Sequence, residues 1–221
     1  MFSRKSTIIA TIFIAFMYLV FVPLVYAATE YKMTDYWPFK EGAWWEFNDG
    51  KIEITGTEEI DGINTFKYLD TGSCVSDEDG EYINVFNNDT NGFGAFLPSE
   101  DGSYSMVKSI EPYVKKGDKT TASYKDSDGG QYTMVFKLEG TANVVVPAGK
   151  FKRCLRFSVK QKLVDKDGNY SYYTGKFYLA KGVGLIKAVI VEESGNEENC
   201  FFGPVSFNVF NGIRKLKDYS N

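Results

Sequence analysis

Residues 144–160 read VVVPAGKFKRCLRFSVK, and they predict a strand, a tight turn and a second strand. Three β-branched valines favour an extended chain, and Pro147 ends that strand because its φ is fixed and it has no N–H to donate. Gly149 then supplies the flexible turn position. Beyond the turn, apolar residues recur at every second position, interrupted at Arg153 and Cys154. We therefore expect an antiparallel hairpin whose turn is set by Pro147 and Gly149.

The Gly149-Lys150 pair has a second interpretation, a loop that cradles phosphate. Such a loop needs glycine at position 144 and a hydroxyl side chain at position 151, where this chain has Val144 and Phe151. The chain therefore lacks both the glycine that an amide cradle needs and the hydroxyl that would bind magnesium. We interpret the turn as structural. The apolar row expected on the buried side of the hairpin consists of Val144, Val146, Phe151, Leu155 and Phe157.

The same alternation extends outward along the chain. It occurs in KIEIT (51–55), in QYTMVFKLE (131–139) and in VSFNVF (205–210), and Asp-Gly or Asn-Gly pairs that favour tight turns separate such runs. The segments 71–80 and 87–103 are the least regular. The pattern predicts an all-β fold of about a dozen mostly antiparallel strands in a curved sheet, either barrel-like or a sandwich.

The first 27 residues have the pattern of a signal peptide. Arg4 and Lys5 precede a long uncharged run, and Val25-Tyr26-Ala27 offers small residues at the positions that signal peptidase reads. We expect cleavage before Ala28, a single β-rich domain over 28–221, and a secreted or periplasmic protein with no stable membrane span after cleavage. An uncleaved anchor is the alternative, since the run is long enough to cross a bilayer.

Charge and composition exclude several function classes. The mature chain would keep 23 basic and 29 acidic residues, a net charge of −6 with no basic excess for nucleic-acid phosphates. There is no histidine, which excludes histidine-activated nucleophiles and metal sites that need an imidazole ligand. We assign no catalytic residue, no cofactor and no metal ligand.

The three cysteines are Cys74, Cys154 and Cys200, and their spacing matches no metal or redox motif. Export would place them where disulfides persist. We expect a bridge between Cys154 and Cys200, since both fall in late strand segments whereas Cys74 falls in a loop.

Three motifs together resemble a broad group of uncharacterised bacterial secreted or periplasmic β proteins. They are DYWPFKEGAWWEF at 35–47, VxVPAGxFxxC at 144–154 and YLAKGVGLIKA at 178–188. Members of that group tend to carry an F-P-L-x-x-G-x-x-W-x-Y opening, a VPAG-x-F hairpin and a late G-V-G-L-V hairpin. The opening here departs in detail, with Trp37-Pro38-Phe39 and Trp45-Glu46-Phe47. The resemblance implies an all-β envelope protein and supplies no catalytic residues.

Three acidic loops raise the alternative of calcium binding. They begin at Asp77, Asp126 and Asp165, but each has glycine at the fourth position and lacks the glutamate that closes an EF-hand loop. All three also separate strand-like runs, so we interpret them as turns.

Aromatic residues are the remaining candidates for a binding site. The chain has 18 Phe, 15 Tyr and 3 Trp, which suit a ligand cavity but are also common in strands. Trp44 and Trp45 must point to opposite faces if both lie in one strand. The candidate ligand-facing aromatics are Trp44, Trp45, Tyr172, Tyr173 and Phe177.

Two functions remain at this point. The first is a non-catalytic exported cell-envelope protein that binds a small apolar or amphipathic ligand or a partner protein. The second is a secreted carbohydrate-active hydrolase that uses paired carboxylates. Glu53, Glu58 and Glu59 lie near the first hairpin, but nothing in the sequence distinguishes them from a solvated face.

Overall fold

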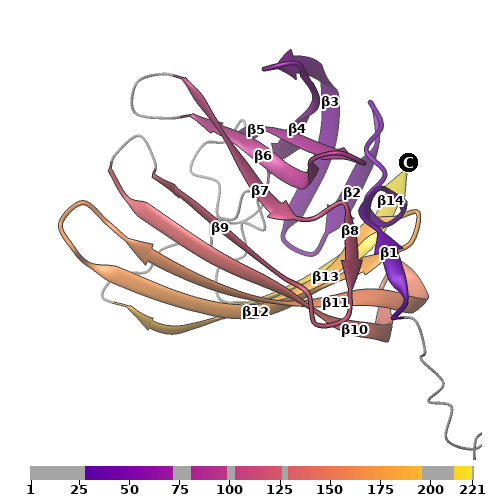
Figure 1. The fold of residues 1–221 in the computed structure, drawn as a ribbon. Helices are drawn as coiled ribbons and strands as arrows, with labels where there is room; N and C mark the ends of the chain where they lie inside the picture. The colour runs from indigo at the N-terminus through magenta and orange to yellow at the C-terminus, as the bar shows by residue number, and fades with distance from the viewer. Residues whose placement is uncertain (1–27, 72–80, 99–102, 126–128, 196–211, 221) are drawn as a thin grey trace, which may run out of the picture.

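The computed structural model describes residues 28–71, 81–98, 103–125, 129–195 and 212–220. Twelve strands form one sheet in the order β7-β6-β5-β4-β3-β2-β14-β13-β12-β11-β10-β9, and neighbouring strands are antiparallel. Figure 1 shows this sheet curled into a nearly closed, barrel-like form, with β3–β7 opposite β9–β13. The predicted all-β class, the number of strands and the curved antiparallel sheet are confirmed.

The first half of the sheet contains six strands: β2 (Trp44–Phe47), β3 (Gly50–Ile60), β4 (Ile63–Asp70), β5 (Glu81–Asn88), β6 (Gly92–Pro98) and β7 (Tyr104–Ile110). The second half contains β9 (Lys119–Lys125), β10 (Gln131–Val146), β11 (Gly149–Val164), β12 (Tyr170–Ala180), β13 (Gly184–Gly195) and β14 (Gly212–Ser220). A separate two-stranded sheet pairs β1 (Glu30–Lys32) with β8 (Tyr113–Lys115), and the short helix α2 (Met33–Tyr36) follows β1.

Strand β14 joins the two halves of the sheet. It pairs with β13 on one side and with β2 on the other, where Tyr219 lies opposite Trp45. The last described strand is thus hydrogen-bonded to the first strand of the twelve-stranded sheet. This arrangement places the β9–β13 strands and the β2–β7 strands in one continuous sheet.

The segment that contains α2 packs on the first half of the sheet. Trp37 is buried and stacks on Phe93 of β6, with ring centroids 4.4 Å apart and an interplanar angle of 17°. The Asn87 side-chain amide donates hydrogen bonds to the carbonyls of Met33 and Trp37, at 3.3 and 2.7 Å. The irregular, aromatic stretch before β2 is therefore part of the core.

The predicted hairpin at 144–160 is present as β10 and β11, with Pro147 in its turn and Gly149 as the first residue of β11. Val146 pairs with Gly149, so Pro147 and Ala148 form the two-residue turn between β10 and β11. Gly149 has a φ of +138°, a value that favours glycine. The Ala148 N–H donates to the Leu216 carbonyl at 3.1 Å, which ties the turn to β14.

The expected apolar row along this hairpin is wrong beyond Phe151. Val144 pairs with Phe151, but Ala142 pairs with Cys154, so two residues of β11 oppose Asn143 in a β-bulge. Arg153, the second of these residues, has a φ of +54°, and its N–H donates to the Asn143 side chain at 3.1 Å.

The bulge displaces the alternation by one residue. Cys154 takes the side of the sheet on which Phe151 lies, and Leu155 and Phe157 take the opposite side. Both sides are covered at this end of the hairpin, because Val144, Cys154, Leu155 and Phe157 are all buried.

One segment that we expected to be irregular contains a strand. Residues 92–98 form β6, which pairs with β5 and β7. Glycine hides the alternation there, and it also permits close approach: a Cβ at Gly94 would overlap the Val107 carbonyl and the Phe86 ring. The predicted leader (1–27), the irregular segment 72–80 and the predicted strand 205–210 lie outside the described residues.

Candidate binding surface on the outer face of the sheet

The structure divides the five aromatics predicted to face a ligand between two environments. Trp45, Tyr173 and Phe177 are buried, whereas Trp44 is half-buried and Tyr172 is exposed. The adjacent tryptophans thus lie in the opposite environments that alternation in β2 requires. The five side chains do not form one site.

The buried aromatics pack against other side chains. Phe177 stacks on Phe157 with ring centroids 4.9 Å apart, and it meets Phe136 edge-on at 6.1 Å. The indole N–H of Trp45 donates to the Val183 carbonyl at 2.5 Å. These contacts are those of cross-strand core packing.

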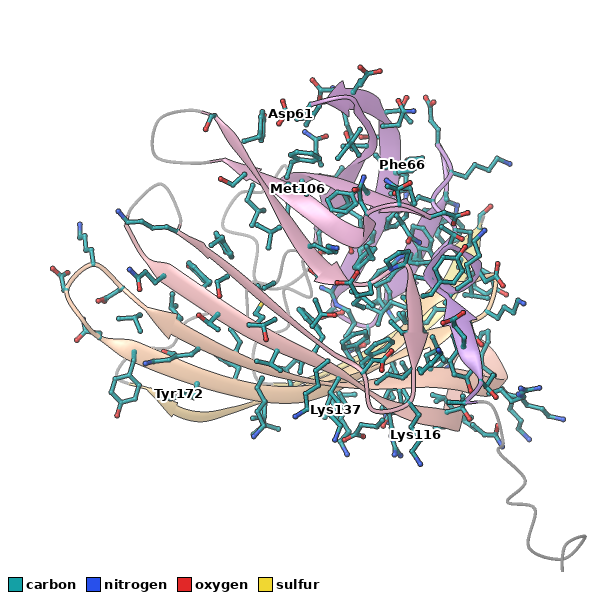
Figure 2. The ribbon with its side chains drawn as sticks, viewed as in Figure 1. Asp61, Phe66, Met106, Lys116, Lys137 and Tyr172 are labelled. Carbon is teal, nitrogen blue, oxygen red and sulfur yellow. The ribbon has the colours of Figure 1, made fainter. Side chains whose placement is uncertain are left out.

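The outer face of β10–β14 collects side chains that are far apart in the sequence. The strand register aligns them in four rows across the sheet. The rows are Arg156, Tyr178, Lys187 and Lys215; Lys137, Ser158, Lys176, Val189 and Ile213; Val135, Lys160, Thr174 and Val191; and Thr133, Lys162 and Tyr172. We call this surface the basic face. Figure 2 shows two of its members, Lys137 and Tyr172, pointing away from the barrel on the same side.

The rows of the basic face contain seven basic side chains and no acidic one. One carboxylate, that of Glu139, lies beside them at a second irregularity of the β10–β11 pairing, 2.9 Å from Arg156 Nε and 3.5 Å from Lys176 Nζ. Among the described residues, no carboxylate pairs with the other five cations. These five are Lys137, Lys160, Lys162, Lys187 and Lys215.

A groove of about 450 Å³ crosses the basic face between β11 and β13. Its lining includes Tyr178, Val189 and Val191 together with Lys160 and Lys176, and Gly175 lies among them. Val191 is 49% exposed, so an apolar side chain in a groove that also has two lysines lies open to solvent.

Two tyrosines hold lysines near the groove. Lys187 Nζ lies 5.7 Å from the centroid of the Tyr178 ring, and Lys162 Nζ lies 5.7 Å from that of Tyr172. Both distances fit a cation–π contact. The two tyrosine rings therefore add apolar area to the basic face, and each holds a lysine ammonium group beside that area.

The core contains a charged cluster that the sequence did not reveal. Arg214 of β14 is fully buried, and its Nε and one terminal nitrogen lie 2.9 Å from Asp49 and 3.1 Å from Asp70. Its guanidinium carbon also lies 5.2 Å from the centroid of the Phe47 ring. Burial opposes the charge, but Asp70 and Asp49 raise the pKa of Arg214 above its ordinary value. The cluster links β14 to the first half of the sheet.

The acidic residues do not resemble a glycosidase pair. Glycoside hydrolysis needs two carboxyl groups that face each other across a sugar ring, whereas Asp49 and Asp70 both pair with the buried Arg214. On the β3–β4 hairpin, Glu53 binds Lys51 at 2.6 Å and Glu58 lies 3.4 Å from Lys67. The hydrolase hypothesis gains no support from these contacts.

The one candidate calcium loop within the described residues is stabilised by its own side chains. Asp165 accepts hydrogen bonds from the N–H groups of Asp167 and Asn169 and from the Asn169 amide, at 2.8–2.9 Å. The Asn169 amide contributes most to lowering the pKa of Asp165. Within the described ranges, no group of three or more potential metal-ligating side chains occurs. The loops at Asp77 and Asp126 lie outside those ranges.

The cysteine bridge is not seen in the structure. Cys154 is a buried free thiol, and burial raises its pKa. Cys74 and Cys200 lie outside the described residues, so the pairing of Cys154 with Cys200 stays a prediction.

Comparisons with known proteins supply no family. No family model and no curated protein matches the chain. A crystal structure described as "a putative lipoprotein from Parabacteroides distasonis ATCC 8503" is similar over 84% of this chain and 98% of that one, at 14% identity and a TM-score of 0.48. In the described part of the chain, no helix has the length and apolar character to cross a membrane.

Proposed function

We propose that the chain is a non-catalytic exported protein, secreted or periplasmic, that binds an amphipathic molecule in the groove between β11 and β13. The observation that carries this proposal is the lining of the groove. Val189, Val191 and Tyr178 offer apolar contact, and Lys160 and Lys176 offer positive charge within the same pocket. An acyl or other apolar chain with an anionic head fits both parts.

The size of the groove supports a small ligand. Its volume of about 450 Å³ lies within the roughly 300–1,000 Å³ of typical small-molecule sites. The groove lies on regular strands, and its lining residues are held by ladder pairing and not by loops. An envelope protein that covers the groove is the alternative partner.

Binding of a labelled fatty acid at a concentration below micelle formation tests the site. We expect the carboxylate-headed chain to bind, and a quaternary-ammonium amphiphile of equal chain length to bind much more weakly. Val191→Glu should abolish binding because it places a carboxylate in the groove.

Val145→Glu is the matched control, since Val145 is also an exposed strand valine (67% exposed) but does not line the groove. Equal binding by both variants would contradict the proposed site. Binding that is lost equally in both would also contradict it.

Export rests on the leader pattern, and it has its own test. N-terminal sequencing of the exported protein should give a chain that begins near Ala28. An intact N-terminus in the membrane fraction would show that the leader is an anchor.

A further inference from the structure

We infer that the basic face docks on a membrane surface that contains anionic lipid, with the groove receiving part of one lipid. This inference rests on the proposed function, because it identifies the amphiphile as a component of a bilayer. It goes further by assigning a role to the whole outer face of β10–β14.

Charge segregation is the first argument. With Glu139 included, the basic face has seven cations and one carboxylate, a net charge of +6. The mature chain as a whole has a net charge of −6. Positive charge is therefore gathered on one face of an acidic protein, and an anionic surface attracts that face.

The opposite side of the molecule is suited to face away from such a surface. The β3–β4 hairpin contains Glu58, Glu59 and Asp61 within four consecutive residues. Figure 2 shows Asp61 at the top of the view, and Lys137 and Tyr172 at the bottom. An anionic bilayer would attract one side and repel the other, which fixes the orientation of the protein.

The position of the apolar side chains favours a bilayer over a nucleic acid. Val189 and Ile213 are adjacent in one row, and Val191 follows in the next, with the cations of flanking rows on both sides. Ile213 and Val191 are 47% and 49% exposed, and Tyr172 is 38% exposed. Surfaces that lie in the headgroup region combine apolar residues, lysines and tyrosines in this way, whereas nucleic-acid interfaces are mainly polar.

The cations are available for such contacts. The five lysines without a carboxylate partner among the described residues project from four of the five neighbouring strands β10–β14, namely β10, β11, β13 and β14. Because ladder pairing fixes the strands, the lysines form a preorganised array. Their side chains can bend toward headgroup phosphates while the stems cover apolar surface.

Vesicle co-sedimentation of the processed, exported protein tests this inference. We expect binding to phosphatidylcholine vesicles that contain phosphatidylglycerol, no measurable binding to pure phosphatidylcholine, and loss of binding in high salt. The variant Lys160→Gln/Lys162→Gln/Lys187→Gln should weaken binding about a hundredfold, because each lysine near an anionic surface contributes about fivefold.

The matched control changes the same charge elsewhere. The control variant is Lys40→Gln/Lys67→Gln/Lys108→Gln, whose three positions lie outside the basic face. Its affinity for the vesicles should stay within about threefold of the parent's, since exposed charges distant from the bilayer are screened. Thermal unfolding of both triple variants shows whether either one has lost its fold.

Three outcomes would overturn the inference: equal weakening in the two triple variants, equal binding to neutral and anionic vesicles, or tighter binding to an oligonucleotide than to the vesicles. The fatty-acid experiment separates the two proposals. If the monomeric fatty acid binds and Val191→Glu abolishes that binding, but vesicles do not bind, the groove function stands and membrane docking is wrong.

Discussion

Gly149 is the residue on which the β10–β11 turn depends most directly. Its φ of +138° strains any side chain, and a Cβ at this position would meet nothing within 4 Å. Gly149→Val should therefore lower the free energy of unfolding through backbone strain alone, by about 1–3 kcal/mol. Lys150→Ala should change it by less than about 0.5 kcal/mol, as is usual for an exposed side chain. Denaturant unfolding measures both.

The phosphate-loop interpretation makes the opposite prediction for these two variants. It requires Lys150→Ala to abolish nucleotide binding while stability is kept. A nucleotide titration of the parent protein decides between the two, and measurable ATP binding that disappears with Lys150 would contradict a structural turn.

Arg214 is the residue whose loss should cost most. Removing the guanidinium leaves Asp70 buried without this partner, and such changes typically cost about 3–5 kcal/mol. We expect Arg214→Met to destabilise the fold by that amount in urea unfolding. Lys217→Met is the control, because its 3.8 Å pair with Glu46 is exposed and contributes about 0–1 kcal/mol at most.

A rescue variant shows whether the loss comes from uncompensated charge. Arg214→Met combined with Asp49→Asn and Asp70→Asn removes the whole buried cluster, so it should recover part of the lost stability. If Arg214→Met is as stable as the parent, or if the combined variant recovers nothing, the cluster does not act as an ion-paired link.

Among the elements, the β11–β12 turn has a pH dependence with a defined sign. Hydrogen bonds from Asn169 hold the pKa of Asp165 below its ordinary value, so this stabilisation is present above that value and is lost as the pH falls through the folded-state pKa. Asp165→Ala should be less stable than the parent at neutral pH. The difference should shrink as the pH falls below about 4, where an ordinary aspartate titrates, and should vanish once the folded-state carboxylate is protonated.

Asp167→Ala is the matched control for this prediction, since Asp167 lies in the same turn and is exposed. Its unfolding midpoint should follow that of the parent from neutral pH to acid. A stability difference for Asp165→Ala that persists unchanged into strong acid would show that the turn is not stabilised by the carboxylate.

The strands differ in how well the period-two pattern of the sequence predicts them. Stretches with regular alternation, such as β10 from Gln131 to Leu138, follow from the sequence because burial on one face imposes the period. The bulge opposite Asn143 was visible only as an interruption at Arg153 and Cys154. Its consequence, a change of side for Leu155 and Phe157, depends on the partner strand. Strand β6 was missed because glycine and alanine carry little pattern.

At the scale of the whole molecule, the sequence could not locate the proposed binding surface. Net charge is a sum over the whole chain, so an acidic total does not indicate that one face has a charge of +6. Period two in FSVK (157–160) predicts that Lys160 lies on the side of its strand opposite Val159, but it cannot place Lys187 and Lys215 in one row with Arg156. That alignment requires the order of four strands, β11 to β14. The predicted aromatics divide between two environments for a related reason, since alternation separates two faces without indicating which one is enclosed.

Lysine reactivity with and without bound amphiphile is the most direct test of the outer face as the binding surface. Acetylation rates, read by mass spectrometry, should fall at Lys160 and Lys176 when the fatty acid saturates the protein, because both line the groove. Rates at Lys40 and Lys67, outside the basic face, should stay unchanged. Unchanged rates at Lys160 and Lys176 while the fatty acid is demonstrably bound would place the ligand elsewhere and contradict the account.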